Sequence, residues 1–190
     1  MSQPPVAYHE HLKTVAVFGG VVSPEECQRL VDLPVQALDA AVDDGTTGGV
    51  NYRLRRTRER VVPPTPDNVW IFRRLAGLVT RFNADAFRFQ LNNTMTVSVL
   101  EYSPEGFFDW HLDLGAGGIE SLRKISLVTF LTPPADYEGG GLCFLDAREP
   151  MRLAQGDTVV FPSYLVHRVE PVTRGTRYTL VSWVHGPPFS

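Results

Sequence analysis

The second half of the chain changes to a two-residue period, and this feature most restricts the fold. From residue 89 onward, short β-branched and aromatic segments follow one another, separated by Gly, Pro and Asp. They read TMTVSVLEY, RKISLVTFLT, GLCFLD, DTVVFPS, VHRVEPV and RYTLVSWV. Successive residues of an extended chain face opposite sides of a sheet. Many short strands at this spacing predict a sandwich or jelly roll rather than a parallel sheet.

The first half carries two helix signals. In SPEECQRLVDLP, Ser23 and Glu26 have the spacing of a capping box and Pro24 stands at the first helical position. A second helix is predicted to start at Thr65–Pro66, in TPDNVWIFRRLAGLVTRFNADAF. Its apolar residues recur at helical spacing: Ile71, Leu75, Leu78 and Phe82. We therefore expect a mainly β protein of the α+β kind, with N-terminal helices packed against the β core.

Length and composition limit the organisation and the partners. The 190 residues, 43% of them hydrophobic, suit a single domain 1–190, with a helical support region 1–88 and a β core 89–190. A net charge of −3 gives no reason to expect nonspecific nucleic-acid binding. Cys27 and Cys143 are too few for a disulfide framework, and no apolar run suits a signal peptide or a membrane span. A cytoplasmic location without membrane contact is expected.

The segment GFFDWHLDLG, residues 106–115, holds a partial metal site. In an extended chain His111 and Asp113 share a face, while Leu112 turns away into the core. A hydrogen-bonded His/Asp pair without a metal remains the alternative. His167 lies inside a predicted strand and can supply a third ligand, whereas His9 and His11 lie near one chain end and His185 near the other. Two histidines and one carboxylate suit non-haem Fe(II) with open positions better than zinc.

The residues after His167 indicate a carboxylate-binding arginine. The loop Thr173-Arg174-Gly175 predicts a hairpin that pairs Val172 with Thr176, Pro171 with Arg177 and His167 with Val181. This register places Arg177 and Trp183 on the face of His167. Arg177 could then pair with a small dicarboxylate that also chelates the metal; a surface hairpin arginine is the alternative.

Arginines also stand at positions 53, 55, 56, 58 and 60. One interpretation is a solvated edge strand or loop. The other is a rim that holds an acidic substrate or a peptide backbone.

Four segments together resemble a known family: YSPEGFFDWHLD, LRKISLVTFLTPPADYEGGGLCF, GDTVVFPSYLVHRVEPVTRGTRYTLVSWV and, more weakly, FGGVVSPEECQRLVDL. They are similar to the 2-oxoglutarate- and Fe(II)-dependent dioxygenases, in the prolyl-4-hydroxylase-like subgroup that includes the PKHD-type hydroxylases. The resemblance implies a double-stranded β-helix (jelly-roll) core and iron held by His111, Asp113 and His167. It also implies 2-oxoglutarate bound by Arg177 and Tyr102, with Trp183 as a pocket wall; for Tyr102 and Trp183 an ordinary structural role stays open.

The resemblance implies the reaction class and leaves the substrate open. O₂ and 2-oxoglutarate would be consumed to hydroxylate an unactivated C–H bond, with ascorbate as a supporting reductant. Asp113 favours hydroxylation, because related halogenases lack this carboxylate. The substrate could be a prolyl or other residue of a peptide or protein, a free amino acid, or a natural-product intermediate. Trp110 and Phe108 could wall the substrate pocket, or could simply be core aromatics.

Two competing functions fit less well. Nucleic-acid demethylases of this kind carry a second arginine where this chain has Trp183. A jelly-roll binding module without turnover would not need the complete ligand set with an arginine on the same face. One departure from the family is Phe130, which stands where relatives carry a tyrosine. Ser126 or Thr129 could take the part of that hydroxyl. The oligomeric state is not predicted.

Overall fold

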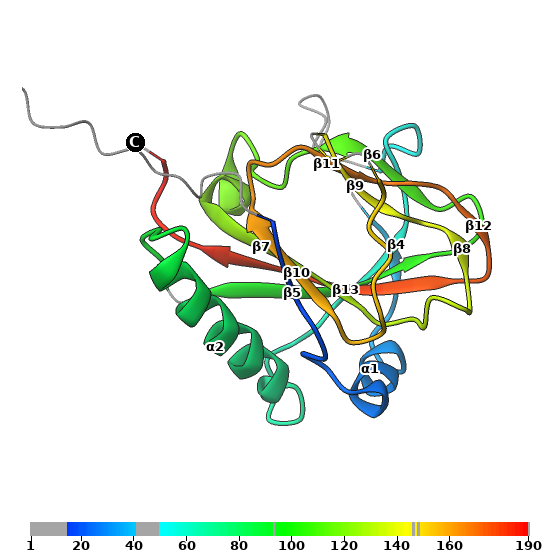
Figure 1. Cartoon of the computed structure of the whole chain (residues 1–190), viewed down its shortest axis with the longest axis horizontal. Coiled ribbons are helices and arrows are strands. Elements are labelled where there is room, and N and C mark those ends of the chain that lie inside the picture. Colours follow the sequence, from blue (N-terminus) through cyan, green and yellow to red (C-terminus); the bar gives the residue numbers. More distant parts are fainter. Residues whose placement is uncertain (1–14, 41–49, 93, 146, 148, 190) are drawn as a thin grey trace, which may run out of the picture.

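Two antiparallel sheets face each other across a buried interior in the computed structural model, which describes residues 15–40, 50–92, 94–145, 147 and 149–189 (Figure 1). The larger sheet has the order β1 (Ala16–Phe18), β10 (Thr158–Pro162), β7 (Arg123–Phe130), β13 (Arg177–His185), β5 (Met95–Tyr102), β4 (Arg58–Val61) and β2 (Leu38–Asp39). The smaller sheet has the order β3 (Arg55–Arg56), β6 (Phe107–His111), β11 (His167–Val169) and β9 (Leu142–Phe144). A short ribbon joins β12 (Val172–Arg174) to β8 (Glu138–Gly139), and a 3₁₀ helix spans Gly118–Leu122. The expected mainly β fold with a jelly-roll core is confirmed.

Alternation along β13 separates two buried layers. Val181 and Trp183 pack into the layer between the sheets, and Leu180 and Val184 pack on the outer face of the larger sheet. The period-two pattern of RYTLVSWV is therefore the pattern of a strand that is buried on both sides.

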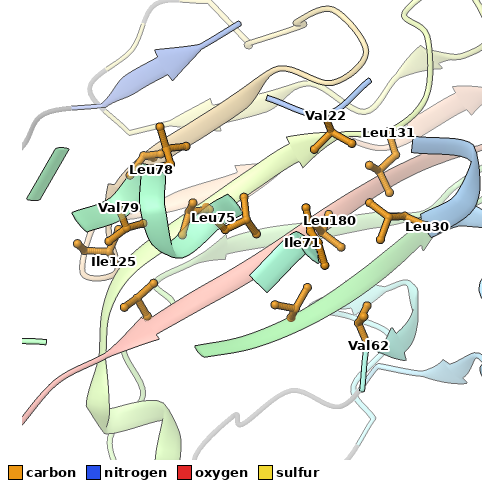
Figure 2. Close-up of a cluster of buried hydrophobic side chains, with 14 of the residues drawn as sticks. Val22, Leu30, Val62, Ile71, Leu75, Leu78, Val79, Ile125, Leu131 and Leu180 are labelled. Carbon is orange, nitrogen blue, oxygen red and sulfur yellow. The ribbon is translucent and has the colours of Figure 1, made fainter. Parts of the chain in front are cut away.

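The outer face of the larger sheet is covered by α2 (Val69–Asp85), which runs along it in Figure 1. Its predicted apolar stripe is buried against β5, β7 and β13, as Figure 2 shows for Ile71, Leu75 and Leu78. Each fully buried aliphatic side chain stabilises the fold by about 1.5–3 kcal/mol. The helix starts later than the sequence suggests, because residues 65–68 form a turn in which the Asn68 amide donates to the Thr65 carbonyl at 3.0 Å.

The capping box of α1 (Pro24–Val31) forms as predicted. The Ser23 hydroxyl accepts from the Glu26 amide at 3.3 Å, and the Glu26 carboxylate accepts from the Ser23 amide at 2.9 Å. Arg74 of α2 donates to the same carboxylate at 2.8 Å, so the cap also ties the two helices together.

The first 88 residues contribute more than helical support. Strands β1 to β4 all lie in this region and extend both sheets, with β3 on the edge of the smaller one. The division into a support region 1–88 and a core 89–190 stays a prediction, as does the single domain. Among the described residues, no helix is both long and apolar enough to cross a membrane.

Candidate metal and carboxylate site

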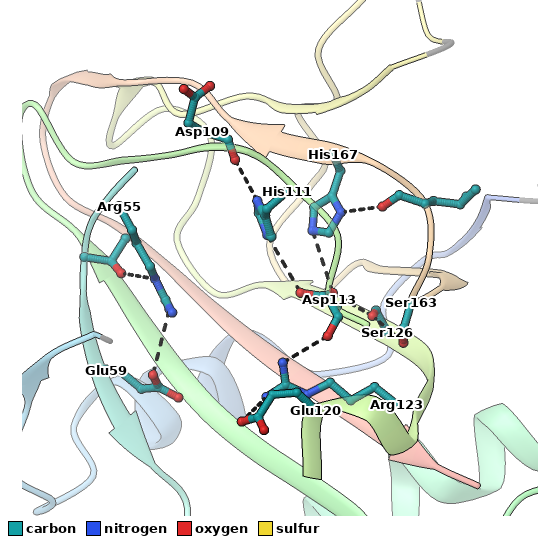
Figure 3. Close-up of polar contacts among 12 residues, drawn as sticks. Arg55, Glu59, Asp109, His111, Asp113, Glu120, Arg123, Ser126, Ser163 and His167 are labelled. Carbon is teal, nitrogen blue, oxygen red and sulfur yellow. Dashed lines mark hydrogen bonds and ion pairs between the residues drawn. The ribbon is translucent and has the colours of Figure 1, made fainter. Parts of the chain in front are cut away.

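Three predicted ligands meet at one end of the smaller sheet. His111 is the last residue of β6, His167 is the first of β11, and the two are direct cross-strand partners. One potential ligand atom from each of His111, Asp113 and His167 lies within 4.8 Å of the others. The Asp113 carboxylate is 3.8 Å from Nε2 of His111 and 3.7 Å from Nε2 of His167 (Figure 3). The antiparallel register thus joins residues that are 56 positions apart in sequence.

Backbone carbonyls orient both imidazoles. Nδ1 of His111 lies 2.7 Å from the Asp109 carbonyl, and Nδ1 of His167 lies 2.9 Å from the Leu165 carbonyl. A carbonyl only accepts, so each Nδ1 carries the proton and each Nε2 offers a lone pair toward Asp113. This is the tautomer that a metal ligand requires.

The Asp113 carboxylate is held from behind. Ser126 on β7 donates to its Oδ2 at 2.6 Å, and the Ser163 hydroxyl lies 2.9 Å from that of Ser126. Arg123 donates to the backbone carbonyl of Asp113 at 3.2 Å. Ser126 therefore supports a candidate metal ligand. It does not replace the hydroxyl of the missing family tyrosine, which is the other role that the sequence suggests for it.

Charge favours metal binding at neutral pH. Burial, together with nearby His167, lowers the pKa of His111 to about 3, so this imidazole stays neutral. Burial acts to raise the pKa of Asp113, but the two histidines and the Ser126 hydrogen bond outweigh it and lower the pKa. A neutral imidazole beside an ionised carboxylate matches the donor set expected for Fe(II).

One detail of the expected metal strand is wrong. Leu112 is 46% exposed and does not reach the core. Strand β6 ends at His111, and the following residues bend across the open end of the sheet, so strict alternation no longer applies. His111 and Asp113 still converge, because the bend turns both toward the interior.

Arg177 lies in the same cavity and is 1% exposed. Its guanidinium carbon is 5.1 Å from the ring centres of both Tyr102 and Phe130. Within the described part of the chain, none of its three guanidinium nitrogens has a hydrogen-bond partner. A buried cation in this state is suited to a carboxylate ligand, which can pair with it in two places.

The predicted hairpin that led to Arg177 does not form. β12 pairs with β8, whereas β13 pairs with β5 and β7 in the larger sheet. The chain turns through Gly175, which has φ 72°, and passes from the ribbon into that sheet. Arg177 faces His167 across the gap between the sheets instead of along one face, and both side chains line one cavity.

Sequence reasoning missed Thr179. It lies two residues after Arg177, lines the same cavity, and carries a buried hydroxyl that has no hydrogen-bond partner among the described residues. The alternation of β13 could have identified it. Thr129, by contrast, bonds to Thr158 at 2.8 Å and is absent from the cavity lining. Thr179 is therefore the available hydroxyl beside Phe130.

Aromatic residues form much of the remaining wall. Tyr102 and Trp183 line the cavity, and Tyr102 is the cross-strand partner of Arg177. Phe108 stacks on His111 with ring centres 3.4 Å apart. Trp110 is 40% exposed and contacts Arg168 outside the cavity lining, so it is not a core residue.

The remaining histidines and most of the arginine run lie away from this cavity. His9 and His11 fall outside the described residues, and His185 lies near Thr94, with its Nδ1 3.2 Å from that hydroxyl. In the run 53–60, Arg58 and Arg60 pair with Glu101. Arg55 alone of the run lines the cavity.

Comparison with known proteins identifies relatives. The family model of the 2OG-Fe(II) oxygenase superfamily matches residues 97–185. A PKHD-type hydroxylase of Acaryochloris marina is 30% identical over 167 residues, which is 86% of this chain and 74% of the relative. A PKHD-type hydroxylase of Delftia acidovorans is 36% identical over 91 residues, covering 44% of this chain and 40% of that protein.

Two solved structures share the fold. A prolyl-4-hydroxylase from Pseudomonas putida superimposes with a TM-score of 0.71 at 20% identity, covering 92% of this chain and 94% of that one. A prolyl hydroxylase from Trichoplax adhaerens, in complex with a hypoxia-inducible-factor peptide fragment, gives 0.72 at 14% identity, covering 90% and 83%.

Proposed function

This chain belongs to the 2OG-Fe(II) oxygenase superfamily, among relatives of the PKHD-type hydroxylases, and on that premise we propose that it hydroxylates a prolyl or other amino-acid residue of a peptide or protein. His111, Asp113 and His167 would hold Fe(II). Arg177 would bind the distal carboxylate of 2-oxoglutarate. When bound, iron and 2-oxoglutarate supply the oxidising chemistry, in which O₂ converts 2-oxoglutarate to succinate and CO₂ and a C–H bond to C–OH.

One observation supports this proposal most. The convergent His-Asp-His set and a buried guanidinium whose nitrogens lack described partners line a single cavity. A metal alone would explain the three ligands, and a structural ion pair would explain an arginine, but neither explains both in one cavity. A metal-chelating dicarboxylate uses both.

The residues of the chain have separate tasks in this mechanism. His111 and His167 offer Nε2 lone pairs, and Ser126 fixes the Asp113 carboxylate by a 2.6 Å hydrogen bond. Tyr102 and Thr179 flank Arg177 and would limit how the cosubstrate lies. Apolar walls exclude water from a reactive site. They come from Leu100, Phe108, Val128, Leu142, Val169 and Val181.

The peptide substrate is the finer part of the proposal. The likeness to prolyl hydroxylases, one of them in complex with a peptide fragment, supports it over a free amino acid. Both cysteines are free, which agrees with a reducing, cytoplasmic location.

Two measurements test the proposed function. Under anaerobic conditions, Fe(II) and 2-oxoglutarate should together give a visible charge-transfer band that neither gives alone. With O₂ and a panel of peptides and amino acids, the protein should release succinate. His111→Ala and Asp113→Ala should lose both signals, and Asp109→Ala, which removes an exposed carboxylate on the same strand, should keep them. Full turnover in either ligand variant would refute the metal assignment.

A further inference from the structure

Arg123 lies behind the candidate metal ligand Asp113, and the proposed function gives it no role. Its Nη1 donates to the backbone carbonyl of Asp113 at 3.2 Å (Figure 3). Its guanidinium carbon lies 4.0 Å from the ring centre of Trp183, which lines the cavity. One planar cation therefore contacts both a candidate ligand and the cavity wall.

The backbone at Asp113 has already left the sheet. Strand β6 ends at His111, and Leu112 is exposed. The next backbone bond from this segment to the sheet runs from the Leu114 amide to the Ser163 carbonyl, at 2.9 Å. Asp113 lies outside the strand, so the bond from Arg123 to its carbonyl takes the place that a ladder bond has within a sheet.

Arg123 is itself held by the elements around it. It is the first residue of β7 and the cross-strand partner of His185. Its backbone amide donates to the Glu120 carbonyl, and its Nη2 lies 3.6 Å from the Glu120 carboxylate. Three residues further along β7, Ser126 donates to the Asp113 carboxylate at 2.6 Å. Strand β7 thus supports Asp113 at its backbone and at its side chain.

We propose that Arg123 is a positioning residue, which uses the Trp183 ring as a platform and holds Asp113 where its carboxylate can bind the metal. This inference rests on the proposed function. The charge of Arg123 alone would have the opposite effect, because a cation beside a metal site repels the metal ion. Removing Arg123 should therefore weaken metal binding if the residue positions Asp113, and should strengthen it if only the charge matters.

Metal binding without turnover distinguishes the two effects. Co(II) is titrated into the full chain under anaerobic conditions, and its Kd is measured from the visible d–d absorption of the bound ion. Loss of a group that orients a metal ligand typically weakens metal binding roughly 10- to 100-fold. Arg123→Gln should raise the Co(II) Kd by that factor. Arg123→Lys keeps the charge but not the planar fork, so its Kd should be intermediate.

Arg168→Gln is the matched control. This change also removes a guanidinium close to a candidate ligand, because Arg168 follows His167 on β11. Arg168 also lies over a tryptophan, with its guanidinium carbon 4.7 Å from the Trp110 ring centre, but outside the cavity lining. The Co(II) Kd of this variant should equal that of the wild type.

A double-mutant cycle tests the platform. Trp183→Leu removes the ring beneath the guanidinium and should raise the Co(II) Kd about 3- to 10-fold. In the Arg123→Gln protein the same change should have almost no further effect, because the cation that the ring supports is already absent. Two effects that simply multiply would contradict the role assigned to Trp183.

The remaining outcomes are equally decisive. An unchanged or lower Co(II) Kd in Arg123→Gln would overturn the proposal, even if the thermal unfolding temperature of that variant falls, because Arg123 would then stabilise the fold without positioning the ligand. If Arg123→Gln does not fold, the Kd of Arg123→Lys decides in the same way. Absence of the Co(II) absorption in the wild type would instead refute the metal site, and with it the proposed function.

Discussion

Replacing Arg177 with Met should abolish stabilisation by the cosubstrate and raise the stability of the ligand-free protein. Met is similar in length and flexible enough to fill the space between Tyr102 and Phe130. The ligand-free protein buries a guanidinium whose nitrogens have no partner among the described residues. Removing an uncompensated buried charge relieves a penalty of several kcal/mol, although the contacts with the two rings are lost, each worth about 0.5–2 kcal/mol. We expect the ligand-free variant to unfold at a higher temperature than the wild type.

Binding of 2-oxoglutarate should stabilise the wild type but not the Arg177→Met variant. With anaerobic Fe(II) present, 2-oxoglutarate at about 100 times its Kd stabilises the folded protein by about 2.7 kcal/mol. For a chain of this size, each kcal/mol moves Tm by about 2–4 °C. The wild type should therefore gain roughly 5–11 °C. Arg177→Met should gain almost nothing at the same concentration.

Thermal unfolding with and without 2-oxoglutarate measures both effects. Arg174→Met is the matched control, because Arg174 is exposed and its pair with Glu138 is a surface ion pair worth at most about 1 kcal/mol. It should change neither Tm nor the ligand-induced gain. A full gain in Arg177→Met would refute the cosubstrate role. A fall in its ligand-free Tm would show that the aromatic rings stabilise the cation better than argued.

Further changes test the surroundings of the site and the fold. Gly140→Ala should weaken 2-oxoglutarate binding, measured as a raised Kd, because Gly140 has φ 62° and an added Cβ would lie 2.8 Å from Cδ of Arg177; an unchanged Kd would contradict this packing. Ser23→Ala removes half of the capping box and should lower the free energy of unfolding by about 1 kcal/mol in urea titrations, with Ser121→Ala in the 3₁₀ helix as the comparison. Burial raises the pKa of Cys27 to about 11, so this thiol should resist labelling by thiol reagents at pH 8 until the protein unfolds; rapid labelling of the native protein would contradict it.

The sequence predicts local features of this protein better than it predicts strand partners. The capping box depends on residues three positions apart, and the apolar stripe of α2 on residues within a few turns. Strand partners depend on contacts between distant segments. The predicted hairpin after His167 does not form, because β12 and β13 belong to different sheets.

The same limit explains the errors at the site. The spacing of His111 and Asp113 was sufficient to predict that they converge, but not that the strand ends between them and exposes Leu112. Arg177 and His167 line one cavity because their strands face each other across the gap between the two sheets. Alternation of side chains along a single hairpin cannot establish this arrangement. Thr179 stands two residues after Arg177 on one strand, so alternation alone is enough to place it in the same cavity.

The distribution of the site over two sheets has a mechanical consequence. His111 and His167 belong to the smaller sheet and Arg177 belongs to the larger one. A cosubstrate that contacts both would tie the two sheets together, so that they could not separate there without releasing it. Amide hydrogen exchange should then slow in β11 and β13 at the same ligand concentration, although no backbone hydrogen bonds join these strands.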